Sequence, residues 1–455
     1  MTFTSVNPHD PGDVLGEWDE AGAAVAAEAA GRAERAARVW ADTPAAARAR
    51  ALGEAAQALE DRAAEFTDLV VREVGKPLSE ARGEVARGVA ILRYYAQSAL
   101  LPDGETIPAA EADQLLMSRR VPVGVAALIT PWNFPVAIPL WKAAPSLAYG
   151  NATILKPSGA AAATALALRD LLSAHLPADV FQVVLGEAET ARTLIDHPAV
   201  GAVSFTGSSL VGRDISARAA ARGLRVQAEM GGQNASIVLP GADLERAASM
   251  VAYAAMGFAG QKCTATSRII VTGEVYDRFR DALAAAIEAL AVVDPADAGT
   301  LVGPVISERA RAAALEAVAG GGGRVLTGGH GLDVPGYYLA PTVVELPEPA
   351  GRLATEEVFA PVAAMIRADS AEQAVQIAND VRYGLVTSVF TGDLGQALRL
   401  TRRLETGMVR VNAPTSGVDF TAPFGGSKES SYGPREQGQA ARDFYTESRT
   451  VLIVP

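Results

Sequence analysis

The chain contains little cysteine and little histidine, and both scarcities narrow the chemistry that it can perform. Cys263 is the only cysteine among 455 residues, so no disulfide can form within the chain and nothing points to an oxidising compartment. The four histidines are far apart and lack the spacing of metal ligands, so we expect no metal site. A nucleophilic pair of cysteine and histidine stays open, because such partners are often distant in sequence.

Long hydrophobic runs are also missing. No apolar stretch approaches the roughly 20 residues that a membrane-spanning helix requires. Residues 1–10 show neither the basic nor the apolar region of a signal peptide, so we expect a cytoplasmic protein without a membrane partner. The net charge of −12 argues against nucleic acid as a partner. The hydrophobic content of 49% and the length of the chain indicate a globular enzyme with two or three domains.

The first part of the chain is helical in character. Alanine, glutamate and arginine dominate residues 21–38, 45–76 and 80–101, and this composition predicts helices. The Gly-Lys-Pro sequence at 75–77 is a stop signal. Residues 102–120 are polar and lack helical periodicity, so we expect extended chain there.

From residue 121 onwards, short strands of Val, Ile and Leu alternate with helices. This spacing is typical of βαβ units and predicts a doubly wound parallel sheet, with strands over 124–129, 152–156, 181–185, 202–205 and 225–229. After Gly231-Gly232 the pattern restarts and predicts a second α/β domain. Residues 450–454 read as an exposed strand that needs a neighbouring edge.

Cys263 is the first candidate for chemistry. A thiol is nucleophilic only as a thiolate, so its surroundings must lower its pKa or a base must take its proton. Lys262 would help if its side chain faced the thiol. The alternative interpretation is a buried, inert cysteine, which is the usual role of an isolated one.

Glu229 and Asn133 could complete a reaction centre. Glu229 ends a predicted strand just before a glycine pair, a place from which a carboxylate can face a cleft and act as general base. Asn133 lies in Pro-Trp-Asn-Phe-Pro, a turn fixed by two prolines, and its amide could hold an oxyanion. The alternatives are a surface ion pair for Glu229 and a helix cap for Asn133.

The segments around Cys263, Glu229 and Asn133 together resemble the aldehyde dehydrogenase superfamily, and the match runs from residue 6 to residue 446. The resemblance implies an α/β aldehyde dehydrogenase-like fold with a doubly wound cofactor-binding domain, an α/β catalytic domain and a small β extension for assembly into a homodimer or homotetramer. The implied limits are 1–100 and 122–230 for the cofactor-binding domain, 231–425 for the catalytic domain, and 101–121 and 440–455 for the oligomerisation strands. It also implies that Cys263 forms a thioester, that Asn133 and the Cys263 N–H hold the oxyanion, and that Glu229 activates water.

The resemblance also implies a nicotinamide cofactor. Gly207 and Ser208 match the family's phosphate-side turn, although a strand-to-helix glycine turn is by itself a weak signal. Residues matching the family's adenosine-ribose lysine, its neighbours and the nicotinamide contacts are Lys156, Ser158, Trp132, Glu357 and Phe359.

One departure bears on the choice of cofactor. Many NAD-dependent members carry a glutamate three residues after the lysine, and here that position is Gly159. A glutamate would repel a 2′-phosphate, whereas Lys156 and Ser158 could contact one. We therefore expect NADP to be preferred and NAD to be accepted.

The C-terminal motifs point to a substrate. Ser-Ser-Tyr-Gly-Pro-Arg-Glu-Gln-Gly at 430–438 resembles the branch that oxidises 2-oxoglutarate semialdehyde (2,5-dioxopentanoate). Trp141 stands where succinate-semialdehyde enzymes usually carry an arginine. We expect Phe134, Ile138, Trp141 and Phe420 to line the aldehyde tunnel, or else to be core residues.

Several alternatives remain open. The substrate could instead be succinate semialdehyde, a phosphonate aldehyde or a broad range of aliphatic and aromatic aldehydes. Transfer of the acyl group to coenzyme A or phosphate is disfavoured by Glu229, because such relatives usually lack that glutamate. A non-catalytic structural homologue is disfavoured by the joint presence of Cys263, Glu229 and Asn133.

Overall fold

Four helices follow a short hairpin in the N-terminal part of the chain. The computed structural model describes residues 2–417 and 419–455. The helices are α1 (Ala23–Asp42), α2 (Ala45–Asp61), α3 (Ala63–Val74) and α4 (Leu78–Ser98). Residues 45–76 thus contain two helices, because Arg62 leaves the helical region at φ −100° and ψ 17°. Helix α3 ends at Gly75, whose left-handed φ of 65° is readily adopted by glycine.

The first sheet has five parallel strands in the order β7–β6–β5–β8–β9, as expected for a doubly wound sheet. The strands are β5 (Val125–Thr130), β6 (Ala152–Pro157), β7 (Phe181–Val183), β8 (Val200–Thr206) and β9 (Arg225–Glu229). Its connecting helices are α5 (Ala137–Ala148), α6 (Ala162–Ser173), α7 (Ala188–Asp196) and α8 (Ser209–Ala221), with a short 3₁₀ turn at Gly159–Ala161.

Alternation along β5 builds a core on each face of this sheet. Ala126 and Leu128 pack into one apolar cluster with α2 to α6. Ala127 and Ile129 pack into another, with residues of α1, α7 and α8. Successive side chains of a strand point to opposite faces, so the apolar residues of this fully buried strand contribute alternately to the two cores.

The second sheet has seven strands in the order β12–β13–β14–β11–β10–β16–β17. Six are parallel, and β12 is an antiparallel edge strand. The strands are β10 (Asn234–Val238), β11 (Thr266–Thr272), β12 (Arg324–Thr327), β13 (Thr342–Leu346), β14 (Val362–Ala368), β16 (Val386–Phe390) and β17 (Met408–Val411). The helices in this part are α9 (Leu244–Met256), α10 (Tyr276–Glu288), α11 (Glu308–Ala319), α12 (Arg352–Thr355), α13 (Ala371–Asn379) and α14 (Leu394–Thr401).

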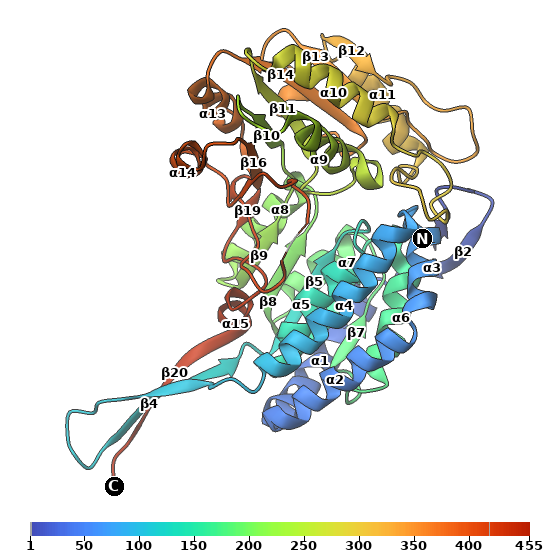
Figure 1. Cartoon of the computed structure of the whole chain (residues 1–455). Coiled ribbons are helices and arrows are strands. Elements are labelled where there is room, and N and C mark those ends of the chain that lie inside the picture. The colour runs from blue at the N-terminus through green and yellow to red at the C-terminus, as the bar shows by residue number, and fades with distance from the viewer. Residues whose placement is uncertain (1, 418) are drawn as a thin grey trace.

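A three-stranded antiparallel arm leaves the body of the molecule. Figure 1 shows β4 and β20 running together away from the two sheets, with the C-terminus near the tip. The arm consists of β3 (Gly104–Ile107), β4 (Leu115–Pro122) and β20 (Thr446–Ile453), in the order β20–β4–β3. The C-terminal strand is therefore longer than the stretch 450–454 that the sequence predicts. The domain limits expected from the sequence stay a prediction.

Short elements complete the chain. An N-terminal hairpin pairs β1 (Thr2–Val6) with β2 (Val14–Asp19). Near the C-terminus, β18 (Ser427–Lys428) pairs with β15 (Tyr383–Gly384), and β19 (Ser431–Tyr432) adds antiparallel to β9. Helix α15 (Ala440–Tyr445) then leads into β20. Among the described helices, none combines the length and apolar character that a membrane crossing requires.

Candidate active site

Cys263 lies in the wall between two cavities. It follows a 3₁₀ turn (Gly257–Gly260) and precedes β11. The first cavity, about 330 Å³, is lined by residues of α4 and is here called the α4 cavity. The second, about 290 Å³, is lined by Gly207 and Ser208 before α8 and is called the α8 cavity. Among the lining residues that the structure describes, Cys263 alone belongs to both cavities.

The surroundings of Cys263 keep its thiol protonated. Burial, followed by the carboxylates of Glu357, Glu229 and Glu436, raises the pKa of this thiol to about 12. Lys262 does not offset the effect, because its ammonium binds Glu80 at 2.6 Å. Lys262 therefore does not lower the pKa of the Cys263 thiol, as the sequence suggested that it could. The thiol requires a base to become nucleophilic.

Glu229 is held at the end of β9 by the C-terminal segment. Its Oε2 accepts a hydrogen bond of 2.6 Å from the Ser431 hydroxyl, while its buried Oε1 has no partner among the described residues. Burial, followed by the charge of Glu436, raises the pKa of Glu229 well above its usual range. The side chain lines neither of the two cavities in this conformation, although it is close enough to influence the Cys263 thiol.

A buried polar network behind Glu229 went unrecognised in the sequence. Lys142 on α5 forms an ion pair with Glu436 and donates to the Ser204 hydroxyl at 2.8 Å. The Ser204 hydroxyl in turn donates to the Gln227 side chain at 2.9 Å. Glu436 belongs to the C-terminal motif at 430–438 that indicates the substrate branch, so the sequence does draw attention to it. The neighbouring residues, however, do not predict that its carboxylate contacts Lys142.

The structure fixes Asn133 from two sides. Its Nδ2 donates to the Gln261 carbonyl oxygen at 2.9 Å, and its own carbonyl oxygen accepts from Lys76 at 2.7 Å. Lys76 is ion-paired with Glu84, whose Oε1 accepts two backbone N–H groups at the start of α5, at 2.8 and 3.0 Å. Asn133 lines the α8 cavity with one amide hydrogen still available for a ligand.

The α8 cavity has the features of a cofactor site. Trp132 and Phe359 line it and meet edge to face, with ring centroids 5.9 Å apart. Glu357 also lines it and accepts the Gly232 N–H at 3.2 Å; burial raises the pKa of Glu357 to about 7.

Unpartnered polar groups at the start of α8 make this cavity fit a phosphate-bearing cofactor. Gly207 and Ser208 line the cavity beside Thr206, and α8 begins at Ser209. The buried hydroxyls of Thr206 and Ser209 have no partner among the described residues. Free hydroxyls and backbone N–H groups at a helix N-terminus suit a pyrophosphate.

The lysine expected at the adenosine ribose lies at the end of β6. The Lys156 ammonium donates to the Gly186 carbonyl oxygen at 2.6 Å, and burial lowers the pKa of Lys156 while Glu187 and Glu20 oppose that effect. The neighbouring Ser158 hydroxyl caps the following turn, accepting the Ala160 N–H at 3.4 Å. Both residues lie outside the lining of the α8 cavity.

The space beside Gly159 is already filled. A Cβ atom at this position would lie 2.8 Å from a ring carbon of Phe3 on β1. The N-terminal hairpin thus closes the place where many relatives are expected to carry a glutamate, and no longer side chain fits there unless Phe3 moves.

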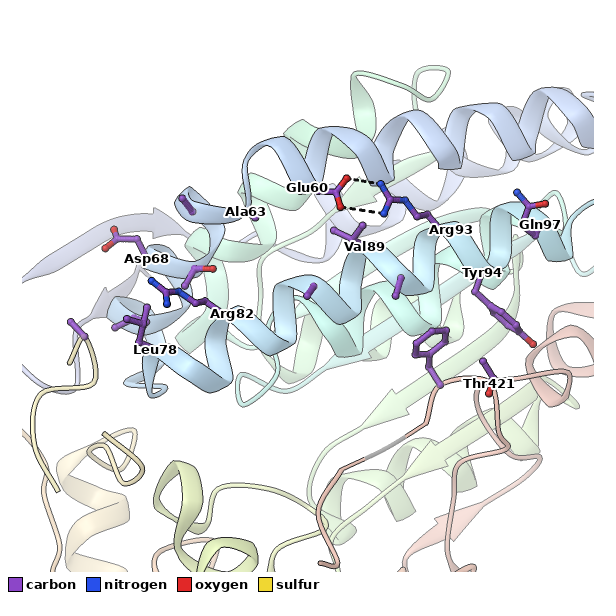
Figure 2. Close-up of a pocket in the computed structure, with 17 residues that line it drawn as sticks. Glu60, Ala63, Asp68, Leu78, Arg82, Val89, Arg93, Tyr94, Gln97 and Thr421 are labelled. Atoms are coloured by element: carbon purple, nitrogen blue, oxygen red, sulfur yellow. Dashed lines mark hydrogen bonds and ion pairs between the residues drawn. The ribbon is translucent and has the colours of Figure 1, made fainter. Parts of the chain in front are cut away.

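The four residues expected along the aldehyde tunnel separate in the structure. Phe134 and Trp141 line the α4 cavity with Cys263. Ile138 lines the α8 cavity instead. Phe420 lines a separate groove of about 860 Å³ along α2, α3 and α4, where its ring meets Tyr94 at a centroid distance of 5.7 Å. Figure 2 shows Tyr94 and Thr421 in that groove.

Phe424 is an additional aromatic residue in the wall of the α4 cavity. Its ring packs against Trp141 with centroids 5.7 Å apart. Phe424 is not among the residues that the sequence predicts along the aldehyde tunnel.

Comparisons with known proteins agree with this geometry. A model of the aldehyde dehydrogenase family matches residues 1–451. The alpha-ketoglutaric semialdehyde dehydrogenase of Bacillus subtilis is 41% identical to this chain, and the alignment covers 99% of this chain and 94% of that protein. The alpha-ketoglutarate semialdehyde dehydrogenase of Haloferax volcanii is 40% identical, with coverage of 99% and 95%.

A solved structure shows the same fold. The crystal structure of an NAD-dependent aldehyde dehydrogenase from Sinorhizobium meliloti superimposes with a TM-score of 0.96 at 33% identity, covering 100% of this chain and 92% of that one. The fold class expected from the sequence is thereby confirmed. The chain belongs to the aldehyde dehydrogenase family and is an NAD(P)-dependent enzyme that oxidises aldehydes.

Proposed function

We propose that this aldehyde dehydrogenase converts 2-oxoglutarate semialdehyde to the corresponding carboxylate through a thioester on Cys263. The observation that carries the catalytic part is the place of Cys263 in the walls of both the α4 cavity and the α8 cavity. An aldehyde in the first cavity and a nicotinamide ring in the second would meet at its sulfur. No other described residue has that position.

The first half of the proposed cycle is acylation of the enzyme. Glu229 takes the proton of the Cys263 thiol, and the resulting thiolate attacks the aldehyde carbon, so that the carbonyl oxygen becomes an oxyanion. The free amide hydrogen of Asn133 and the backbone N–H of Cys263 donate to that oxyanion. A nicotinamide held in the α8 cavity would accept the hydride that leaves the carbon, so that a thioester remains on Cys263.

The second half is hydrolysis of that thioester. Once Glu229 has passed its proton to solvent, it takes a proton from water, and the resulting hydroxide attacks the thioester carbon. The carbon–sulfur bond then breaks, which releases the carboxylate and restores the Cys263 thiolate. A buried carboxylate with a raised pKa is a stronger base than an exposed one, which suits this role. The described conformation keeps Glu229 on Ser431 and outside both cavities, so the side chain must turn toward the thioester for this step.

NADP is our proposed preferred cofactor, with NAD accepted as well. The absence of a carboxylate at Gly159 and the nearby ammonium of Lys156 support binding of a 2′-phosphate. The carboxylates of Glu20 and Glu187 also act on Lys156 and favour NAD. Comparing kcat/KM for the two cofactors decides the point: a higher value with NADP supports the proposal, and a higher value with NAD refutes it.

The substrate proposal is tested with a panel of aldehydes. It is supported by the names of the Bacillus and Haloferax relatives, at 41% and 40% identity. The panel contains 2-oxoglutarate semialdehyde, succinate semialdehyde, and neutral aliphatic and aromatic aldehydes. We expect the highest kcat/KM for the first. Strong activity on neutral aldehydes alone would refute the substrate while leaving the chemistry of Cys263 in place.

The arm suggests how the enzyme assembles. Strand β20 is an outer strand of its sheet and exposes Leu452 and Ile453, and Val454 directly after the strand is exposed as well. An edge strand with exposed apolar side chains is suited to pairing with another chain, and we propose a homodimer or homotetramer. Light scattering of the purified enzyme gives the subunit number, and a monomer would contradict this proposal.

The single unpaired thiol also supports a cytoplasmic location.

A further inference from the structure

Helix α4 places an arginine without a described partner in the wall of the α4 cavity. Arg87 is half-buried and lines this cavity together with Cys263. Within the described part of the chain, no carboxylate forms an ion pair with its guanidinium. Arg93, further along the same helix, differs because it binds Glu60 at 2.6 Å, as Figure 2 shows.

The other charges in this wall cancel one another. The Lys262 ammonium binds Glu80 at 2.6 Å. Glu84 is ion-paired with Lys76, which is completely buried. These two pairs leave the positive charge of Arg87 unbalanced within the cavity.

Two more charged groups lie near Arg87, and neither neutralises it. Asp419 is exposed, and its carboxylate already accepts two hydrogen bonds from Thr421, at 2.6 and 3.0 Å. Arg410 on β17 is half-buried, and burial followed by the charge of Arg87 lowers the pKa of Arg410. Two neighbouring guanidinium groups repel each other, and a bound anion would relieve that repulsion.

Hydrogen-bond donors in the same cavity also lack partners. The Ser416 hydroxyl and the Trp141 indole nitrogen are buried and have no partner among the described residues. Each residue is 5% exposed, and each lines the α4 cavity. Buried polar groups normally have a partner, so these two donors indicate that a ligand completes the site.

We propose that Arg87 binds the carboxylate of the aldehyde substrate, and that Ser416 and Trp141 donate hydrogen bonds to the same ligand. This inference rests on the proposed function and deepens it, because it restricts the substrate to aldehydes with an anionic group remote from the reacting carbon. A guanidinium is suited to the task since it offers parallel donors to a carboxylate. The cavity volume of about 330 Å³ favours a short chain between the two ends.

The test compares two arginines of the same helix. Arg87→Met removes the charge from the α4 cavity, whereas Arg82→Met removes an exposed charge that lines the separate groove of Figure 2. Each variant and the wild type are assayed with 2-oxoglutarate semialdehyde and with pentanal, a neutral aldehyde of equal chain length. We expect Arg87→Met to lower kcat/KM for the anionic aldehyde by about 10- to 100-fold, mainly through KM, because a charged hydrogen bond is lost. Pentanal turnover by Arg87→Met, and both activities of Arg82→Met, should stay within about twofold of wild type.

The outcomes separate this inference from the proposed function. An equal loss on both aldehydes, or no loss on either, overturns the role of Arg87. If wild type oxidises pentanal but shows no preference for the anionic aldehyde, the inference also fails while the aldehyde chemistry stands. If wild type oxidises neither aldehyde, the proposed function itself fails.

A binding measurement gives a readout that does not depend on turnover of the anionic aldehyde. Glutarate, a dicarboxylate of similar length, should inhibit pentanal oxidation competitively in wild type. Its inhibition constant should rise about 10- to 100-fold in Arg87→Met and less in Arg87→Lys, which keeps the charge but not the paired donors. An inhibition constant that is the same in all three proteins would overturn the site.

Discussion

Replacing Ser431 with alanine removes the one hydrogen bond that the described structure gives to the Glu229 carboxylate. That bond stabilises the charged form of Glu229 against burial and against the charge of Glu436, both of which raise its pKa. The pKa of Glu229 should therefore be higher in Ser431→Ala than in wild type. A general base acts only when it is deprotonated, so hydrolysis of the thioester should require a higher pH than in wild type.

The size of the effect follows from the strength of the lost bond. A hydrogen bond to a charged group contributes about 1.5–3 kcal/mol. Since 1.36 kcal/mol corresponds to one pH unit, the acid limb of the kcat profile should move upward by about 1 to 2 pH units. On that limb, the rate at a fixed pH should fall about 10- to 100-fold.

The assay is kcat against pH, under conditions in which a burst of NAD(P)H shows that hydrolysis limits turnover. Ser431→Ala also removes the acceptor of the Gly426 N–H. Ser431→Thr keeps the hydroxyl for both partners and should therefore show the wild-type profile. Ser427→Ala is the matched control, because that hydroxyl binds the Glu405 carbonyl oxygen rather than Glu229. A folded Ser431→Ala enzyme with an unmoved acid limb would refute the role of Glu229 as a base tuned by Ser431.

Three further predictions concern the thiol, the support of Asn133 and the cofactor. Because the pKa of Cys263 is about 12, its alkylation by iodoacetamide in the cofactor-free enzyme should keep rising about tenfold per unit up to pH 10, and a plateau near pH 8.5 would contradict this. Lys76→Met should lower the stability to urea by about 3–5 kcal/mol, because Glu84 stays buried without its partner; a loss below 1 kcal/mol would be inconsistent with a buried pair. Gly159→Glu should destabilise the enzyme, because the new side chain would collide with Phe3. Adding Phe3→Ala should restore stability, and the double variant should have a higher kcat/KM ratio of NAD to NADP than wild type. Equal stability of the single and double variants would show that the contact is harmless.

Local sequence was sufficient for much of the fold. The strand expected at 225–229 has the bounds of β9, because Val226 and Ala228 alternate with polar residues shortly before a glycine pair. The break between α2 and α3 was not predicted, since Arg62 has no helix-breaking side chain and the interruption lies in its backbone angles. Propensity describes side chains and carries little information about such a break.

Contacts between segments that are far apart in the chain could not be predicted from the sequence. Ser431 and Glu229 are 202 positions apart, and no local pattern pairs them. Helix α4 carries Arg82, Arg87 and Arg93 at similar spacing, yet one is exposed, one faces the α4 cavity and one binds Glu60. Which role each arginine takes depends on the elements packed around the helix, which the helix sequence does not encode.

The aromatic residues show the same limit. From the sequence we expect Phe420, and not Phe424 four positions further along, to line the aldehyde tunnel. The structure places Phe424 in the α4 cavity and Phe420 in the neighbouring groove. Phe424 is buried and Phe420 is half-buried, and the path of the loop that carries them, which local sequence does not predict, decides which ring lines the α4 cavity.

The central claim is that the substrate becomes covalently attached to Cys263 and that Glu229 releases it. The most direct measurement is intact-protein and peptide mass spectrometry of Glu229→Gln after mixing with NADP and 2-oxoglutarate semialdehyde. We predict one equivalent of NADPH formed in a burst and an acyl group on the peptide that contains Cys263, with neither in Cys263→Ala. Dehydrogenase activity near wild type in Cys263→Ala, or an acyl group on another residue, would contradict the account.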